Sequence, residues 1–234
     1  MLSADSIAVS YGKLLALDNV TLEVADGDFV AVIGSNGAGK TTLLRAISGL
    51  TAISQGAITY NGSRLDGLIP RLICEMGIVQ IPEGRHIFPL MNVKENLQLG
   101  AYLQPARKKI PESLERVFSL FPRLKERQNQ SAKTLSGGEQ QMLAIGRGLM
   151  ARPSLMILDE PTMSLSPKLA ADILGTLKTL NRQGITILLV SQEVYHSLQL
   201  ARKTYVIENG RIVLSGTGEE LSQSEHVRKA YLGL

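Results

Sequence analysis

The sequence predicts an α/β fold: a mostly parallel sheet covered by helices, with an N-terminal antiparallel β-layer and an inserted helical segment. Three observations lead to this prediction. Short apolar runs rich in β-branched residues alternate with helical stretches, as in parallel sheets with crossover helices. Strands follow one another in quick succession from residue 7 to residue 62, and strand patterns are missing between about residues 92 and 150. We therefore expect one domain, 1–234, made of a sheet core with its β-layer, 1–83 and 151–234, and a helical subdomain, 84–150.

The N-terminal strands are joined by turns rather than by helices. The turn Asp26-Gly27-Asp28, for example, separates two of them. Because connections this short favour antiparallel pairing, we expect these strands to form the β-layer. The four expected strands cover residues 7–10, 20–24, 29–33 and 55–62.

Proline and glycine mark the boundaries of the elements that follow. Pro105, Pro111 and Pro122 each start or end a helix in the inserted segment, because proline lacks an N–H and cannot continue a helix. Asn209-Gly210 predicts a tight two-residue hairpin turn near the C-terminus. The expected later strands cover residues 155–158, 186–190, 204–207 and 211–214.

Composition narrows the function classes. The chain has 234 residues, 44% of them hydrophobic and 20% charged, which is enough to bury a sizeable core. The net charge of +4 forms no long basic block and aromatic residues make up only 4%, so we expect no nucleic-acid partner. Cys74 is the sole cysteine, which fits a reducing compartment. We expect no signal peptide, and the apolar runs are far shorter than the roughly 20 residues that cross a bilayer.

The most informative stretch follows the strand that ends at Ile33. It matches the phosphate-binding pattern G-x4-G-K-[ST] in the required order of strand, loop and helix. Its glycines let backbone N–H groups surround a phosphate, while Lys40 reaches the β- and γ-phosphates and the Thr41 hydroxyl binds Mg²⁺. A glycine-rich turn that only joins a strand to a helix needs neither Lys40 nor Thr41. The expected nucleotide-binding residues are Gly34, Ser35, Asn36, Gly37, Ala38, Gly39, Lys40, Thr41 and Thr42.

Two adjacent carboxylates, Asp159 and Glu160, come at the end of the buried strand expected at residues 155–158. Ligands of open α/β sheets bind at this end of the strands. We expect Asp159 to hold Mg²⁺ and Glu160 to accept a proton from the attacking water or to orient it. An apolar run that ends in Asp-Glu is weak evidence of a catalytic site by itself. Together with the phosphate loop, it predicts a site of nucleotide hydrolysis.

A third motif, Leu-Ser-Gly-Gly-Glu-Gln-Gln at residues 135–141, leads into a helix. Ser136 and Glu139 have the spacing of a helix capping box, which by itself accounts for both residues. It does not account for Gly137 and Gly138, which destabilise a first helical turn unless another group must approach the backbone closely. A helix N-terminus with a serine and two glycines also suits an anion, and the two interpretations are compatible.

These three motifs, in this order, resemble those of the ATP-binding subunits of ATP-binding cassette (ABC) transporters, over essentially the whole chain. The resemblance implies a RecA-like P-loop NTPase core with ATP and Mg²⁺ as cofactors, and ATP hydrolysis coupled to transport. It also implies that two such subunits close head to tail around two ATP molecules. Each ATP would lie between one phosphate loop and the other subunit's Ser136, Gly137 and Gly138. Tyr11 matches the aromatic residue that stacks on adenine, although a tyrosine at a strand end can simply pack on the core.

Three positions depart from the general pattern of the family. Counting back six residues from the proline of Phe88-Pro89 places Glu83, in place of the usual Gln, in the loop that binds Mg²⁺ or its water. Gln80 is nine residues away from that proline and inside a strand. Gln192 stands where a switch His is usual, and its amide can hydrogen-bond the γ-phosphate or water but cannot titrate. Ser166 replaces an Asp that supports communication between the two ATP sites in the family.

These departures occur together in one branch of the family, the smaller ATP-binding subunit of branched-chain or hydrophobic amino-acid importers. The resemblance therefore implies the motor of such an importer, at the cytoplasmic face of the inner membrane. Its implied partners are a second, paralogous ATPase subunit, two membrane-spanning permease subunits and, indirectly, an extracytoplasmic solute-binding protein. The helical arm near residues 84–104 would contact the permeases. Motors of urea or short-chain amide importers, motors of lipid exporters, and soluble cassette ATPases of nucleic-acid or cofactor-assembly processes are the alternatives.

Overall fold

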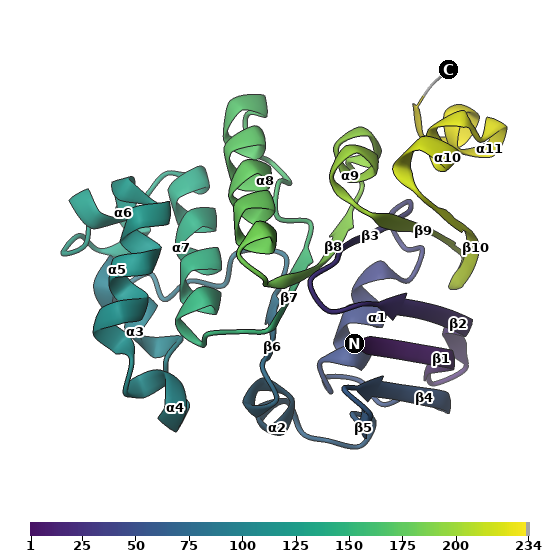
Figure 1. Cartoon of the computed structure of the whole chain (residues 1–234), viewed down its shortest axis with the longest axis horizontal. Coiled ribbons are helices and arrows are strands. Elements are labelled where there is room, and N and C mark those ends of the chain that lie inside the picture. The colour runs from purple at the N-terminus through teal and green to yellow at the C-terminus, as the bar shows by residue number, and fades with distance from the viewer. Residues whose placement is uncertain (233–234) are drawn as a thin grey trace.

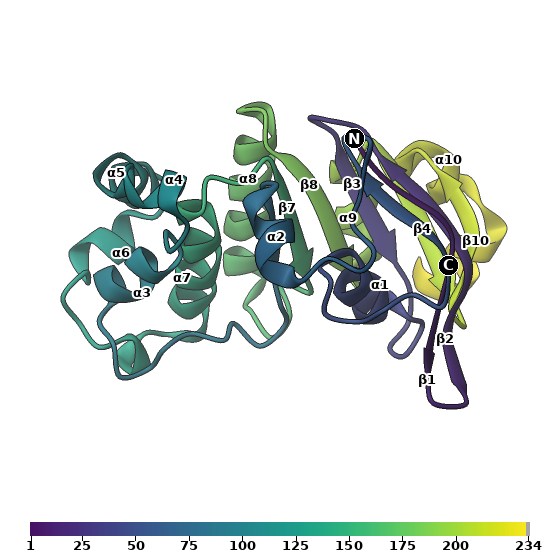
Figure 2. The ribbon, with the colours of Figure 1, turned by 90° about the horizontal axis from the view of Figure 1, so that it is seen from below.

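Two β-sheets and an arm of helices build the molecule (Figure 1). The computed structural model describes residues 1–232. Seen from below, the helical arm lies at one end and the antiparallel sheet toward the other (Figure 2). The prediction of an α/β fold with an antiparallel layer and an inserted group of helices is confirmed.

The smaller sheet is antiparallel. Across the sheet, its strands are β2 (Leu14–Val24), β1 (Leu2–Tyr11), β4 (Gln55–Tyr60) and β5 (Ser63–Arg64). One face of this layer is buried and the other is exposed. Along β2, for example, Val20, Leu22 and Val24 are buried and the residues between them are exposed, as expected for a sheet with one solvated face.

The larger sheet is parallel except at one edge. Its strands, in order, are β10 (Arg211–Gly216), β9 (Lys203–Glu208), β3 (Phe29–Ile33), β8 (Thr186–Ser191), β7 (Leu155–Asp159) and β6 (Ile78–Ile81). β9 and β10 form the antiparallel pair, and the other neighbours are parallel. The hairpin predicted at Asn209-Gly210 joins β9 to β10, and both turn residues have the left-handed backbone that a type I′ turn requires, with φ of +48° and +78°.

One prediction about the β-layer is wrong. The short turn before β3 predicts that this strand belongs to the antiparallel layer. The strand instead lies near the centre of the parallel sheet, between β9 and β8. All five residues of β3 are buried because helices cover both faces of this sheet, and such a continuous apolar run is typical of a central parallel strand. The short connection after Val24 therefore crosses from one sheet to the other instead of turning back within one.

One helix is enclosed between the two sheets. α1 (Lys40–Ile47) follows β3, and its Leu43 and Ile47 are fully buried in a core that includes residues of both sheets. This burial fixes the start of α1, and with it the loop between β3 and α1, relative to the strand ends.

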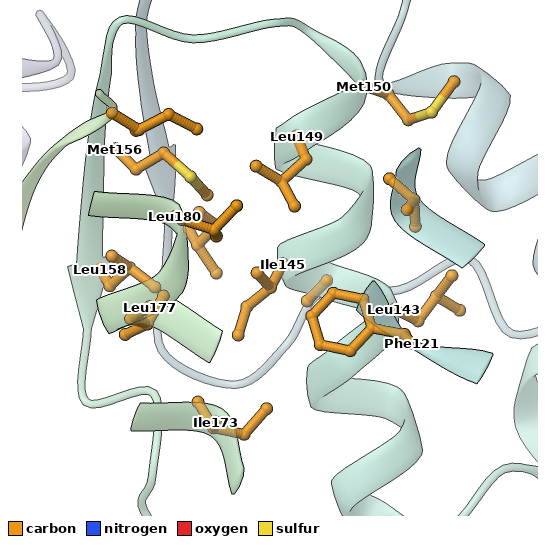
Figure 3. Close-up of a cluster of buried hydrophobic side chains, with 14 of the residues drawn as sticks. Phe121, Leu143, Ile145, Leu149, Met150, Met156, Leu158, Ile173, Leu177 and Leu180 are labelled. Carbon is orange, nitrogen blue, oxygen red and sulfur yellow. The ribbon is translucent and has the colours of Figure 1, made fainter. Parts of the chain in front are cut away.

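The opposite face of the parallel sheet carries α7 (Gly137–Met150) and α8 (Pro167–Arg182). Figure 3 shows side chains of α7 between those of β7 and α8 on one side and Phe121 of the arm on the other. Ile145 of α7 is fully buried in this cluster. The arm is therefore joined to the sheet through a continuous apolar core, and α7 belongs to both.

The remaining helices lie beside β6, in the arm and in the C-terminal region. They are α2 (Pro70–Glu75), α3 (Val93–Leu99), α4 (Gln104–Arg107), α5 (Ile110–Leu120), α6 (Pro122–Glu126), η1 (Ala132–Thr134), α9 (Val194–Leu200), α10 (Gly218–Gln223), α11 (Glu225–Val227) and η2 (Arg228–Leu232). Pro105, Pro111 and Pro122 each lie in the first turn of a helix, as predicted. No helix within residues 1–232 is long and apolar enough to cross a membrane.

Candidate active site

The phosphate loop leaves the C-terminal end of β3 and enters α1, and two of its glycines, Gly34 and Gly39, stand where a side chain does not fit. A Cβ at Gly34 would lie 2.3 Å from the carbonyl oxygen of Ile207 on β9. Gly39 has a left-handed φ of +109°, and a Cβ there would lie 2.8 Å from a methyl carbon of Leu17. The neighbouring strands therefore hold the loop in a shape that requires glycine at these two positions.

The β9–β10 hairpin supports this loop from outside the motif. The Gly210 N–H donates to the Ala38 carbonyl at 2.9 Å, and the Gly210 carbonyl accepts from the Asp18 N–H at 2.8 Å. A Cβ at Gly210 would lie 2.6 Å from the carbonyl oxygen of Ala16. The sequence predicts a hairpin at Gly210 but not its contact with the phosphate loop, because the two segments are far apart in the chain.

Lys40, the first residue of α1, directs its ammonium group back into the loop. Its Nζ donates to the carbonyl oxygens of Gly34 at 2.7 Å and Ser35 at 3.1 Å, and Oε1 of Glu160 lies 3.3 Å away. Both charged side chains are 6% exposed, so water screens this ion pair little. A shielded ammonium group next to a helix N-terminus is suited to bind phosphate oxygens.

β7 places Asp159 and Glu160 side by side, and β8 holds Glu160 from the other side. Glu160 has a left-handed φ of +46°, which is uncommon for a residue with a side chain. Its N–H donates to the Val190 carbonyl at 2.9 Å, and its Oε2 accepts from the Gln192 N–H at 3.0 Å. Among the described residues, its Oε1 has no hydrogen-bond partner and faces Lys40. One oxygen of this carboxylate is therefore fixed and the other can accept a proton.

Asp159 is 2% exposed, and no group within residues 1–232 hydrogen-bonds its Oδ1. Burial raises the pKa of this carboxyl, the charges of Glu160 and Glu83 raise it further, and the Thr41 hydroxyl beside it opposes the shift. A buried carboxylate oxygen with no partner, close to two other carboxylates, is unfavourable unless a cation binds there.

The donor set around Asp159 fits Mg²⁺ bound together with a nucleotide. Proteins usually hold Mg²⁺ with one or two carboxylates and phosphate oxygens of the substrate, not with a complete cage of side chains. In the part of the chain that the structure describes, no group of three or more His, Cys, Asp and Glu side chains could hold a metal by itself. Thr41, Glu83 and Asp159 therefore provide a partial set of ligands that nucleotide phosphates would complete.

Tyr11 and Glu83 line a pocket of about 480 Å³ at the phosphate loop. Glu83 follows β6 and is exposed, whereas Gln80 lies inside β6 and lines a different pocket. Tyr11, at the end of β1, is 45% exposed, and the hydrogen bond between its hydroxyl and that of Thr51, at 3.2 Å, lowers the pKa of Tyr11. The ring is therefore available to a planar ligand and is not packed into the core.

Gln192 lies beside the start of the phosphate loop because β8 pairs with β3. Its side-chain Nε2 donates to Oδ1 of Asn36, and its backbone N–H donates to Glu160. Gln192 thus connects the phosphate loop to the Glu160 carboxylate. Its amide offers a hydrogen-bond donor and an acceptor in this position but no titrating group.

Residues 136–138 do not line this pocket. Ser136 is exposed and caps α7: its N–H donates to Oε2 of Glu139 at 2.8 Å, and its Oγ accepts from the Glu139 N–H at 3.4 Å, which confirms the predicted capping box. A Cβ at Gly138 would lie 2.6 Å from a methyl carbon of Leu169. Within one chain the third motif therefore stays apart from the phosphate loop.

Arg85 is a neighbour of the site that the sequence does not single out for a role. Its guanidinium lies against Gly137, where a Cβ would be 3.1 Å from both terminal nitrogens. The only sequence signal is its place two residues after Glu83. Within this chain, the groups that lie close to the backbone of these two glycines are the Arg85 guanidinium at Gly137 and the Leu169 side chain at Gly138.

Comparison with known proteins identifies the family. The family model for ABC transporters matches residues 17–163. The chain belongs to the ABC transporter family. It is 46% identical, over all of both chains, to the high-affinity branched-chain amino acid transport ATP-binding protein BraG of Pseudomonas aeruginosa. It is 34% identical to the probable branched-chain amino acid transport ATP-binding protein LivF of Archaeoglobus fulgidus, over 100% of this chain and 99% of the relative, and 31% identical to LivG of Escherichia coli, over 100% and 98%.

Solved structures agree with this assignment. The crystal structure of the ADP conformation of an ATP-binding cassette of an ABC transporter matches with a TM-score of 0.86 at 29% identity, covering 100% of this chain and 99% of the other. A dimeric post-hydrolysis state of another ATP-binding cassette, bound to ADP and Pi, matches with a TM-score of 0.78 at 26% identity, covering 93% and 98%. This ABC cassette is thus a nucleotide-binding ATPase.

Proposed function

We propose that this ABC cassette is the ATP-hydrolysing motor subunit of an importer of branched-chain or other hydrophobic amino acids. The observation that carries the proposal is the full-length identity of 46% to a branched-chain amino acid transport ATP-binding protein. A second observation supports the proposal: one pocket is lined by Lys40, Thr41, Glu83 and Glu160. The presence of Glu83 and Gln192 in place of the usual Gln and His supports the same branch of the family.

In the proposed reaction, residues of this chain bind ATP and handle the proton. Lys40 exchanges its bonds to the Gly34 and Ser35 carbonyls for bonds to phosphate oxygens. Glu160 accepts a proton, at the oxygen that faces Lys40, from the water that attacks the γ-phosphate. Gln192 orients that water or the γ-phosphate with its amide, while its backbone N–H keeps Glu160 in place.

We propose that Mg²⁺ binds with ATP beside Thr41, Asp159 and Glu83. When bound, this cation neutralises charge that develops on the β- and γ-phosphates. The unpartnered Oδ1 of Asp159 supports this position. Glu83 adds a second carboxylate where an amide is usual, so Asp159 and Glu83 together give the cation more negative charge than the common pattern does.

A second ATPase subunit completes each nucleotide site in this proposal. Ser136 is exposed and lies outside the chain's own pocket, so the third motif is available to the nucleotide of another cassette. The dimeric cassette with ADP and Pi supports such pairing. We propose a paralogue as the second subunit, since relatives named LivF and LivG both match the whole chain.

The proposed membrane partners are two permease subunits, with an extracytoplasmic solute-binding protein acting through them. The cassette would then work at the cytoplasmic face of the membrane. Exposed apolar side chains on and beside the arm support this, among them Phe88, Leu90, Leu99 and Tyr102, with Leu90 84% exposed. Apolar groups exposed in this way are typical of a surface that another protein covers.

Uptake by the reconstituted transporter tests the proposed function. Vesicles that contain the two cassettes and the permeases, with the solute-binding protein present, should take up labelled leucine when ATP is on the cassette side. Unlabelled branched-chain amino acids should compete with this uptake, and urea and short-chain amides should not. Glu160→Gln is the control variant, which should bind ATP and support no uptake.

Other outcomes of this experiment would reassign the chain. Competition by urea or short-chain amides in place of amino acids would change the substrate, and ATP-driven lipid movement would indicate an exporter. Recovery of the cassette with nucleic acid, and not with detergent-solubilised membrane subunits, would favour a soluble cassette ATPase. Stimulation of ATP hydrolysis by none of these solutes would contradict the importer.

A further inference from the structure

The loop of residues 82–88, which we call the Glu83 loop, is attached to separate parts of the molecule at its two ends. It begins at the end of β6 in the parallel sheet and places Glu83 in the nucleotide pocket. At the other end, the Phe88 N–H donates to Oδ1 of Asn96 at 2.8 Å, and Nδ2 of Asn96 donates to the Phe88 carbonyl at 2.9 Å. Because Asn96 lies on α3 and is fully buried, this end of the loop moves with the helical arm.

Arg85 attaches the middle of the Glu83 loop to the first turns of α7. Its guanidinium lies against the backbone of Gly137, and its Nη1 donates to Oε1 of Gln140 at 3.3 Å. In the opposite direction, Nη2 of Arg147 on α7 donates to the Arg85 carbonyl at 3.4 Å. Arg85 therefore contacts the helix with both its side chain and its backbone, and the contact begins at the residue that follows Ser136.

The backbone at this attachment has an unusual conformation. Gly84, Arg85 and His86 have left-handed φ values of +82°, +65° and +44°. Residues with side chains seldom adopt this region, and such a run persists only where surrounding contacts outweigh the strain. The contacts of Arg85 with α7 are of this kind. Removing them should let the loop relax and should move Glu83, two residues away.

We infer that Arg85 is a positioning residue that links the occupancy of this chain's own nucleotide pocket to the conformation of residues 136–138. Glu83 faces the nucleotide held by this chain's phosphate loop. Residues 136–138 face the nucleotide of the second subunit, a point that rests on the proposed function. Because Arg85 is close to Glu83 in the chain and touches Gly137, a shift of Glu83 on nucleotide binding displaces the first turn of α7. Each site thereby responds to the other through one side chain.

The loop after Glu160 offers a weaker contact with the same helix start. Ser166, in that loop, caps α8 by accepting from the Leu169 N–H at 3.4 Å. The methyl groups of Leu169 in turn lie against the backbone of Gly138. Arg85, by contrast, reaches α7 with a charged hydrogen-bond donor, and hydrogen bonds to charged groups are stronger than neutral ones.

Hydrogen exchange of the isolated full-length chain tests the link without any membrane partner. The probe is Mg·ATP, added in the Glu160→Gln background so that it is not consumed, at a protein concentration where sedimentation shows a monomer. In this parent, Mg·ATP should change the exchange rates of the amides of residues 136–140 by about fivefold. With Arg85→Ala added, the change should disappear at a Mg·ATP concentration that saturates the variant. Equilibrium binding sets that concentration, because a displaced Glu83 weakens Mg·ATP binding.

Matched variants separate the contact from a general effect of losing an arginine. Arg116 also donates to a glutamine, Gln183, at 2.8 Å, but it lies on α5 outside the pocket, so Arg116→Ala should keep the full response. Arg85→Lys retains the charge without the planar fork and should restore part of the response. Gln140→Glu turns the acceptor into an anion and should retain all of it.

The outcomes distinguish this inference from the proposed function. An unchanged response in Arg85→Ala, or no response in the parent at saturating Mg·ATP, would overturn the link. In the assembled transporter, Arg85→Ala should lower the Hill coefficient of ATP hydrolysis relative to Arg116→Ala, and equal coefficients would also overturn it. If the parent does not bind Mg·ATP, the proposed function fails and the inference fails with it.

Discussion

The two parts of the chain that we propose to contact nucleotide differ in how complete they are. The phosphate loop, Asp159 and Glu160 lie at the ends of central strands, and Lys40 and Gln192 both contact Glu160 within the chain. Residues 136–138 lie at a helix start whose Ser136 is exposed and whose cap comes from the same helix. The first part is a nearly complete set of contacts within one chain, and in the proposed dimer the second is one half of a site.

The difference follows from what each part must hold. A lysine and two carboxylates can stay close together only if several elements fix them and water is kept away. A helix start proposed to meet another subunit must instead be exposed and must keep its shape before that subunit arrives, and the capping box of Ser136 and Glu139 stabilises that shape. Substitutions should therefore affect chemistry and folding in the first part, and assembly in the second.

Glu160→Gln should have the largest effect, and it tests whether the first part is a complete catalytic site. The amide cannot accept a proton, so ATP turnover should fall by about 100-fold or more. The Kd for ATP should change by no more than about threefold, because Lys40 and the phosphate loop, which bind the phosphates in our proposal, are unchanged. Phosphate release and equilibrium binding measure the two quantities. Turnover within about tenfold of the parent would remove Glu160 from the role of base.

Alanine at one glycine of each part compares how tightly the two parts are enclosed. Gly34→Ala puts a methyl group 2.3 Å from the Ile207 carbonyl and should lower the free energy of unfolding by about 2 kcal/mol. Gly137→Ala meets only the end of the Arg85 side chain, and the better helix propensity of alanine, about 1 kcal/mol, should offset that shift. Urea unfolding measures both. Equal losses would show that the two parts are equally rigid.

Ser136→Ala tests whether the second part acts mainly in assembly. Loss of the cap should lower the free energy of unfolding by about 1 kcal/mol, and the Kd of the isolated chain for ATP should not change. ATP turnover of the assembled transporter should fall. Thr217→Ala is the matched control, because Thr217 caps α10 in the same kind of box with Glu220. It should cost similar stability and leave turnover intact; a parallel loss of turnover in both variants would make the Ser136 effect one of stability alone.

Asp159→Asn should change the free energy of unfolding least, and it measures how much stability the first part gives up. The pKa of Asp159 is raised in the folded chain, so the unfolded chain releases this proton first as pH rises. Stability due to this group therefore falls as pH rises from its ordinary pKa of about 3.9 to the raised value, and stays reduced above it.

Without metal or nucleotide, Asp159→Asn should raise the free energy of unfolding by about 0.5 kcal/mol at pH 7. The gain should shrink as pH is lowered toward 4, where the parent carboxyl is protonated as well. Urea unfolding at several pH values measures this trend, and Mg·ATP should stabilise the variant less than the parent. An equal gain at every pH would contradict the role of a buried charge.

Local patterns locate the residues of the first part in the sequence but do not specify the contacts between distant parts of the chain. Lys40, Thr41, Asp159 and Glu160 can be located because each lies at a strand end in a motif of fixed spacing. β3 was assigned to the wrong sheet, since a short turn before a strand does not specify which sheet the strand joins. Its uninterrupted burial is the feature that indicates a central parallel strand.

The sequence by itself determined the family, the α/β fold, the residues of the phosphate loop and the two carboxylates, because these depend on spacing within a few residues. Only the tertiary structure decided that Gly210 supports the phosphate loop, that Gln192 holds Glu160, and that Arg85 packs on Gly137. Each of these contacts joins segments that are far apart in the chain. They form only when the sheet and the arm pack together, and no local pattern of residues specifies which distant side chain will meet which backbone.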